Sequence, residues 1–268
     1  MNVPLVEFTK VCFSYGRHEV LHNVSFTIEA NSFVGIVGPN GGGKTTLLRL
    51  LLGLIKPERG TIRVFGKSPQ KARAQTGYVM QHMEYDSRFP ATVMDIVLMG
   101  RVHNHWVGPY SREDKRHAEK ALEEVGMKGM ELKPFAELSG GQQQRTLIAQ
   151  ALSGEPKILI LDEPTANIDI EGEQAIHSTL SSLKEKMTIL SVSHNVNTVI
   201  STVSHVLCVN RTAVINPIDE LHPDTIAKTY GGTMAVLHHA MNCHVFDHSR
   251  TQTLPHGAEL TDRKSEAE

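Results

Sequence analysis

The sequence predicts an α/β protein with a parallel central sheet covered by helices on both faces, an antiparallel β part near the N-terminus and an inserted α-helical subdomain. Residues 157–161, 171–184 and 188–192 follow the order strand, helix, strand, which is typical of a parallel sheet. Upstream, the apolar run 32–37 leads through a glycine-rich turn into residues 45–54, whose apolar side chains recur at helical spacing. That turn, between a strand and a helix, is the first indication of function.

The remaining strands are expected at short segments of alternating or apolar residues. Residues 5–13 alternate apolar and polar side chains, and 24–28 do so more weakly, so both are expected in a half-buried sheet. Further strands are predicted at 61–65 and 77–80, and a hairpin that closes the core at 206–209 and 213–215.

Strand patterns disappear from about residue 82 to residue 155, where charge-dotted helical segments such as 112–125 replace them. We therefore expect an α/β core made of residues 1–81 and 155–232, with residues 82–154 inserted as a helical subdomain. Residues 233–268 are His-rich and then polar, so we expect a flexible tail.

Composition narrows the class of protein. The formal net charge of the 268 residues is −2, so no basic field indicates a nucleic-acid partner. Cys12, Cys208 and Cys243 are odd in number and far apart, which fits a reducing cytosol rather than a disulfide framework. The sequence has no secretory signal and no run of 18 apolar residues, so we expect another chain to supply any membrane crossing.

The glycine-rich turn matches the phosphate-loop pattern G-x-x-x-x-G-K-[ST] and predicts a phosphate-loop NTPase core. Glycines let consecutive N–H groups curl toward an anion, and the following helix points its positive dipole end at the same place. The lysine adds charge for the β and γ phosphates, and the hydroxyl of Thr45 can ligate Mg²⁺. The residues predicted to bind ATP here are Gly38, Pro39, Asn40, Gly41, Gly42, Gly43, Lys44, Thr45 and Thr46.

An apolar strand at 158–161 ends in two acidic residues, Asp162 and Glu163. Asp162, at the end of the strand, is expected to hold Mg²⁺. Glu163, one residue further on, is expected to polarise the water that attacks the γ-phosphate. Alone, two acids after a strand could begin an ordinary solvated loop, but the upstream phosphate loop favours the catalytic interpretation.

A third motif specifies the subclass. Leu138 is followed by Ser139, Gly140, Gly141 and Gln142, at the start of a helix that runs to about residue 153. A serine hydroxyl and exposed N–H groups at a helix N-terminus form an anion trap. The motif resembles the LSGGQ signature of ATP-binding-cassette (ABC) ATPases. In that family the signature faces the nucleotide held by the other subunit, which implies an ATP-dependent homodimer.

The same resemblance assigns roles to four further residues. Tyr15 corresponds to the aromatic residue that stacks on adenine, and Gln81 to the glutamine that contacts Mg²⁺ and the attacking water. Asp169 belongs to the loop that crosses the dimer interface, and His194 corresponds to the histidine that touches the γ-phosphate. Asn195 stands where the family commonly has aspartate, a mild departure. The set is complete enough to predict active ATP hydrolysis.

The cargo is suggested by residues 89–101, together with 84–86 before them and Tyr-Gly-Gly at 230–232, which resemble bacterial manganese, zinc and iron importers. The resemblance implies integral membrane permease subunits as partners, an extracytoplasmic substrate-binding protein as an indirect one, and a peripheral location on the cytoplasmic face of a bacterial membrane. Two alternatives stay open: uptake of an iron–chelate or vitamin complex, and a soluble ABC ATPase not tied to transport.

The tail concentrates metal-binding residue types within eleven positions. Histidine and cysteine side chains suit Zn²⁺ and similar ions, and pairs four residues apart could share a metal on a helix. Sensing or buffering of cytoplasmic metal is one hypothesis, and an incidentally His-rich end is the alternative. The residues concerned are His238, His239, Cys243, His244 and His248.

Overall fold

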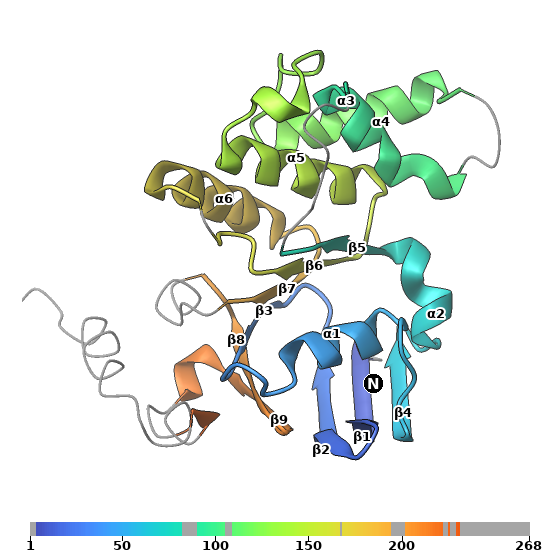
Figure 1. The fold of residues 1–268 in the computed structure, drawn as a ribbon, viewed down its shortest axis with the longest axis vertical. Coiled ribbons are helices and arrows are strands. Elements are labelled where there is room, and N and C mark those ends of the chain that lie inside the picture. The colour runs from blue at the N-terminus through green and yellow to red at the C-terminus, as the bar shows by residue number, and fades with distance from the viewer. Residues whose placement is uncertain are drawn as a thin grey trace, which may run out of the picture. The chain divides into compact units, whose positions relative to one another are not determined.

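The computed structural model describes residues 4–81, 90–104, 109–166, 168–193, 202–221, 225 and 229–230. Predictions that concern His194 and the His-rich tail lie outside these residues. The chain divides into two units, residues 1–234 and residues 235–268, and the described residues all belong to the first (Figure 1).

The larger sheet has six strands in the order β5-β6-β7-β3-β8-β9. Pairing is parallel from β5 to β8 and antiparallel between β8 and β9, so the predicted parallel sheet and closing hairpin are confirmed. The strands are β3 (Phe33–Val37), β5 (Thr76–Val79), β6 (Ile158–Asp162), β7 (Thr188–Val192), β8 (His205–Asn210) and β9 (Thr212–Pro217).

The smaller sheet is antiparallel, in the order β2-β1-β4, and is built from β1 (Val6–Tyr15), β2 (His18–Ile28) and β4 (Arg59–Val64). This confirms the expected antiparallel β part. Strand β2 begins at His18, six residues before the start of the weak alternation at 24–28. The cause is local, because Val20 and Leu21 are adjacent and both buried, which breaks the period of two.

Helix α1 (Lys44–Leu51) lies between the two sheets (Figure 1). Its leucines Leu47 and Leu48 are buried in one hydrophobic core with side chains from both sheets, including Phe8 of β1 and Ile160 of β6. A helix sandwiched in this way is apolar on most of its surface. The phosphate-loop helix is therefore held rigidly where it leaves β3.

The opposite face of the larger sheet is covered by α5 (Gly140–Ser153) and α6 (Ile170–Leu183), which lie side by side. Strand β6 is buried on both faces, as expected for a continuous apolar run in a parallel sheet. Figure 1 shows α3 (Val93–Leu98) and α4 (Arg112–Glu124) grouped with α5. The shorter helical turns are α2 (Pro69–Ala72), η1 (Arg73–Gln75), η2 (Met99–Asn104), η3 (Phe135–Glu137) and η4 (Ile218–Glu220).

A buried ion pair ties η2 to α4. The Arg101 Nε atom donates to Asp114 Oδ1 at 3.0 Å, and the Arg101 Nη1 atom donates to the backbone carbonyl of Ser153 at 3.0 Å. The two side chains are only 9% and 3% exposed. Asp114 also completes the capping box of α4 by accepting from Ser111. One guanidinium thus joins η2, α4 and the end of α5.

We expect Arg101→Ala to lower the free energy of unfolding by about 3–5 kcal/mol, because the buried Asp114 carboxylate would lose its counter-charge. Urea unfolding followed by circular dichroism measures the change. Arg116→Ala is the matched control, since Arg116 is 73% exposed and pairs only loosely with Glu113; it should cost no more than about 1 kcal/mol. Equal effects of the two substitutions would contradict the importance given to the buried pair.

Candidate nucleotide-binding site

The loop between β3 and α1 fits only glycine at two of its positions. Gly43, which caps α1, has φ 104°, and a Cβ added there would lie 2.7 Å from Leu21 Cδ2. A Cβ added at Gly38 would overlap the carbonyl oxygen of Val209 in β8. The loop is therefore seated against β2 on one side and β8 on the other, which fixes the direction of its backbone N–H groups.

Lys44 turns back over this loop. Its Nζ atom donates to the carbonyl oxygens of Gly38 at 2.7 Å and Pro39 at 3.0 Å. Burial lowers the pKa of the Lys44 ammonium, while the nearby carboxylates of Glu163 and Asp162 act in the opposite direction. A desolvated ammonium whose hydrogen bonds go to neutral carbonyls gains from charge-assisted bonds to a negatively charged ligand. This is the charge that the phosphate-loop pattern predicts.

The acidic pair stands at the same edge of the sheet. Because β3 and β6 are parallel neighbours of β7, their carboxyl ends lie together, and Asp162 and Glu163 face the loop that follows β3. Glu163 has the left-handed backbone angle φ 51°, and its N–H donates to the carbonyl of Val192 in β7 at 3.1 Å. A non-glycine residue held in this conformation is characteristic of functional sites.

Gln81 reaches the acidic pair from β5. Its Nε2 atom donates to Glu163 Oε2 at 2.5 Å, although the two residues are 82 positions apart in the chain. Strand β5 pairs with β6 in parallel, so Gln81 leaves the sheet beside Glu163. The two residues that the family resemblance associates with the attacking water are thus in direct contact.

Tyr78 is a member of this cluster that sequence reasoning missed. Its hydroxyl donates to Asp162 Oδ2 at 3.4 Å. Burial raises the pKa of Tyr78 to about 12, and the neighbouring Asp162 carboxylate adds to the rise. No local motif marks this tyrosine, because its contact with Asp162 depends on the pairing of β5 with β6.

Between pH 10 and about 12, we expect the free energy of unfolding to fall more in the wild-type protein than in Tyr78→Phe. The folded pKa of Tyr78 is raised, so its contribution is complete below the unfolded value of 10.0 and is lost as pH rises through the folded value. Urea midpoints measured across this range give the comparison. Identical pH profiles would show that Tyr78 titrates as in the unfolded chain.

A cavity of about 480 Å³ opens beside the loop. It joins Tyr15 of β1 to the phosphate loop, Gln81 and Glu163, so four separately predicted parts of a nucleotide site line one space. The side chains of His18 and Val20, at the start of β2, also line it and were not predicted. The lining residues are Tyr15, His18, Val20, Pro39, Asn40, Gly41, Gly43, Lys44, Thr45, Thr46, Gln81 and Glu163.

Tyr15 stands at the rim of the cavity, where 46% of the residue is exposed. Its ring meets Phe13 edge-on, with centroids 4.9 Å apart, and its hydroxyl accepts a hydrogen bond from Arg49 Nη1 at 3.3 Å. These two contacts orient the ring while leaving a face open. An oriented, exposed aromatic ring is suited to stacking on a flat base.

The signature residues lie elsewhere, and none of them lines this cavity. Ser139 caps α5, accepting from the N–H of Gln142 at 3.3 Å, and the Gln142 side chain accepts from the Ser139 N–H at 3.2 Å. Asp169 caps α6 in the same manner through Gly172. The two helix starts are in close contact, since a Cβ added at Gly141 would lie 3.0 Å from Gly172 Cα. They form a second surface, separate from the cavity.

One further contact with the loop was not predicted as such. The N–H of Gly38 donates to the hydroxyl of Tyr230 at 3.1 Å. The sequence marked Tyr230 only as part of a family resemblance. The hydrogen bond shows that this tyrosine fixes the first residue of the phosphate loop, from a position 192 residues away.

The site combines a glycine loop that carries a lysine, between a parallel strand and a buried helix, with two acids at the end of β6, on the far side of β7 from β3. These features define a phosphate-loop nucleotide-binding protein. A family model described as ABC transporter matches residues 21–166. The chain belongs to the ABC transporter family, as one of its ATP-binding, ATP-hydrolysing cassettes. Among the described residues, no helix has the length and apolar character that crossing a bilayer requires.

The chain is similar to subunits of metal transport systems. It is 42% identical to a probable metal transport system ATP-binding protein of Chlamydia pneumoniae, over 75% of this chain and 84% of the relative. It is 37% identical to a manganese transport system ATP-binding protein of Halalkalibacterium halodurans, over 87% and 94% of the two chains. A zinc uptake system ATP-binding protein of Listeria innocua is also 37% identical, over 79% and 85%.

Solved structures agree with the fold. A metal-chelate type ABC transporter in an inward-facing conformation aligns with a TM-score of 0.75 at 28% identity, covering 85% of this chain and 89% of the other. The α/β cassette fold predicted from the sequence is therefore confirmed.

Proposed function

We propose that this protein is the ATP-hydrolysing subunit of a membrane importer whose cargo is a divalent transition-metal ion such as zinc, manganese or iron. The observation that carries the proposal is the single cavity shared by Lys44, Gln81 and Glu163. It is supported by the metal transport functions named for the relatives. The work of binding and hydrolysis is divided among these residues as follows.

The adenine ring stacks on Tyr15, and the phosphates lie along the N–H groups of the loop at the start of α1. Lys44 exchanges its carbonyl contacts with Gly38 and Pro39 for the β and γ phosphate oxygens. Tyr230 keeps Gly38 in place during this exchange through its hydrogen bond to the loop.

Oxygen donors for Mg²⁺ converge on the same edge of the sheet. Thr45 and Gln81 line the cavity, and the carboxylate of Asp162 is buried next to it. Hydroxyl, amide and carboxylate oxygens are the donors that Mg²⁺ prefers, so the residues fit the ion. When bound, Mg²⁺ would neutralise charge that develops on the phosphate oxygens.

Glu163 is the proposed general base. Its carboxylate opens onto the cavity and accepts from Gln81, so the amide fixes the oxygen that would take a proton from the attacking water. Gln81 supplies the second contact to that water. His194 is proposed to contact the γ-phosphate; it follows β7 in the sequence, and β7 lies between β3 and β6.

A second copy of the chain completes the site. Ser139, Gly140, Gly141 and Gln142 face the nucleotide of the partner, and Asp169 crosses the interface beside them. The separation of this surface from the cavity supports the arrangement, because one chain then offers each half to a different nucleotide. ATP would join the copies head to tail, and its hydrolysis would release them.

These roles divide the chain into two functional parts. We propose that residues 1–81 and 155–232 act as the nucleotide-binding core and 82–154 as the helical insert. A groove of about 320 Å³ lies between them, at the junction of β5, η2 and α5. Met80, which is 50% exposed, lines this groove one residue before Gln81. A permease segment bound there would be next to the water-binding glutamine.

The complete system would comprise permease subunits, the ATPase dimer on the cytoplasmic face of the membrane, and an extracytoplasmic substrate-binding protein. An importer of metal chelates is the second candidate, favoured by the structural similarity to a metal-chelate type transporter. The relatives and the solved structure reported above are all named as parts of transport systems or transporters, so they do not favour a soluble ABC ATPase that is not tied to transport.

Metal content of cells that lack the gene tests the proposal. We expect the cellular content of zinc, manganese or iron to be reduced, and to be restored by the wild-type gene but not by the Glu163→Gln gene. We also expect the tagged protein to co-purify with a multi-span membrane protein. Unchanged metal content with loss of uptake of an iron chelate would favour the second candidate. A preparation that contains only nucleic acid would refute transport altogether.

A further inference from the structure

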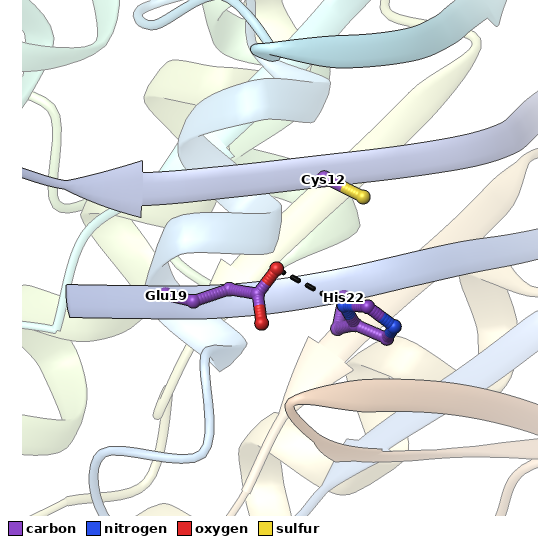
Figure 2. A group of neighbouring side chains, drawn as sticks. All are labelled: Cys12, Glu19 and His22. Atoms are coloured by element: carbon purple, nitrogen blue, oxygen red, sulfur yellow. Dashed lines mark hydrogen bonds and ion pairs between the residues drawn. The ribbon is translucent and has the colours of Figure 1, made fainter. Parts of the chain in front are cut away.

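Three side chains with different metal-binding atoms come together on the antiparallel sheet, outside the nucleotide cavity. Cys12 projects from β1, and Glu19 and His22 project from the neighbouring β2 (Figure 2). Glu19 Oε1 and His22 Nδ1 are 3.0 Å apart, and one ligand atom from each of the three side chains lies within 4.8 Å of the other two. Neither the family resemblance nor the nucleotide site accounts for this cluster.

The backbone brings the three side chains together through two irregularities in strand pairing. In a regular strand, residues three apart such as Glu19 and His22 point to opposite faces. Here Phe13 pairs with Leu21 and the next residue, Ser14, pairs with Glu19, so β2 contains one extra residue. The displaced strand turns both side chains toward the same exposed face, as β-bulges do.

A second irregularity follows directly after His22. Asn23 has φ 47°, and its N–H donates to Cys12 Sγ at 3.2 Å. The contact holds the sulfur toward β2, on the side where Glu19 and His22 lie. An ordinary His–Glu pair on a surface needs no bulge in the strand. Here two adjacent bulges direct three ligand-type side chains toward one point.

The donor set indicates the class of ion. A thiolate and an imidazole suit Zn²⁺ and its borderline neighbours, whereas Mn²⁺ and Mg²⁺ prefer oxygen donors alone. With Zn–S of about 2.3 Å and Zn–N of about 2.0 Å, tetrahedral geometry puts sulfur and nitrogen roughly 3.5 Å apart. Glu19 and His22 are 52% and 62% exposed, so their side chains can rotate by the small amount needed. Water would complete a fourth position.

The cluster is connected to the phosphate loop through one residue. The N–H of His22 donates to the carbonyl of Arg211 at 2.7 Å, and the N–H of Arg211 donates to the carbonyl of Gly42 at 3.0 Å. Leu21, next to His22, lies against Gly43. An ion that fixes this part of β2 therefore acts on two glycines of the nucleotide site.

We propose that Cys12, Glu19 and His22 form a binding site for a zinc-class divalent cation, and that its occupancy changes the affinity of the phosphate loop for ATP. Binding of the cation does not depend on what the protein transports. Its interpretation as feedback from imported metal rests on the proposed function.

Cobalt(II) titration of the full-length Cys243→Ser protein tests the site, because this variant removes the cysteine of the His-rich tail. A thiolate bound to cobalt gives a charge-transfer band that histidines and carboxylates do not give. We expect one equivalent of cobalt to produce the band and zinc to abolish it. The band should vanish in Cys12→Ser, require at least tenfold more cobalt in His22→Gln, and persist in Cys208→Ser, whose thiol is buried in β8. A band that survives Cys12→Ser, or no band at all, would overturn the site.

The link to the loop is tested by the Kd for ATP with and without one equivalent of zinc. We expect at least a fivefold change in the Cys243→Ser protein, in the range of typical couplings between sites, and no change once Cys12→Ser is added. Chelation of zinc by ATP would shift both proteins equally, and that outcome would refute the link. Neither measurement involves transport, so failure here is distinguishable from failure of the proposed importer function.

Discussion

We expect the Glu163→Gln protein to bind ATP with near wild-type affinity but to hydrolyse it at least ~10²-fold more slowly, since a positioned general base contributes about 10²–10⁴-fold. Glutamine has the size of glutamate and can occupy the same left-handed backbone position, so the fold and the contact with Gln81 are retained. Only the capacity to accept a proton is removed. ATP should consequently accumulate between two copies of the chain.

Steady-state phosphate release and size-exclusion chromatography with ATP give the two readouts. Glu185→Gln is the matched control, because Glu185 is exposed and does not line the nucleotide cavity. It should hydrolyse ATP at the wild-type rate and form no stable dimer. Hydrolysis close to normal in Glu163→Gln would mean that another group takes the proton. Slow hydrolysis with no dimer would instead contradict the role given to Ser139.

The second large effect is expected from Lys44→Ala, which should weaken ATP binding roughly 10- to 150-fold, the equivalent of about 1.5–3 kcal/mol for a hydrogen bond to a charged group. The lysine is desolvated and lies over the loop, where its ammonium donates to the carbonyls of Gly38 and Pro39. Its charge is thus positioned for phosphate before the nucleotide arrives. Loss of the γ-phosphate contact should also abolish most hydrolysis.

Isothermal titration with ATP and with AMP distinguishes a local effect from a general one. AMP has no β or γ phosphate, so its affinity should be nearly the same in Lys44→Ala and wild type. Lys67→Ala, in an exposed turn after β4, serves as the control for loss of a positive charge. If AMP binding fell as much as ATP binding, the substitution would have disturbed the loop rather than removed a phosphate contact.

Residues close together in the chain account for what the sequence predicted well. The loop at 38–45, the acids Asp162 and Glu163, and the capped helix after Ser139 are each built from consecutive residues whose chemistry depends on local backbone geometry. Strand and helix alternation then indicated the parallel sheet, because a parallel connection needs a crossover helix. These local features are sufficient to indicate the family and its ATPase chemistry without any tertiary contact.

Only the tertiary structure could assemble the rest. Gln81 meets Glu163 and Tyr78 meets Asp162 because β5 pairs with β6, and Tyr230 reaches Gly38 across 192 residues. The Cys12 cluster depends on two bulges that a pattern of alternating residues does not reveal. The physical reason is common to all of these: local motifs specify backbone geometry, whereas strand order and register decide which distant side chains become neighbours.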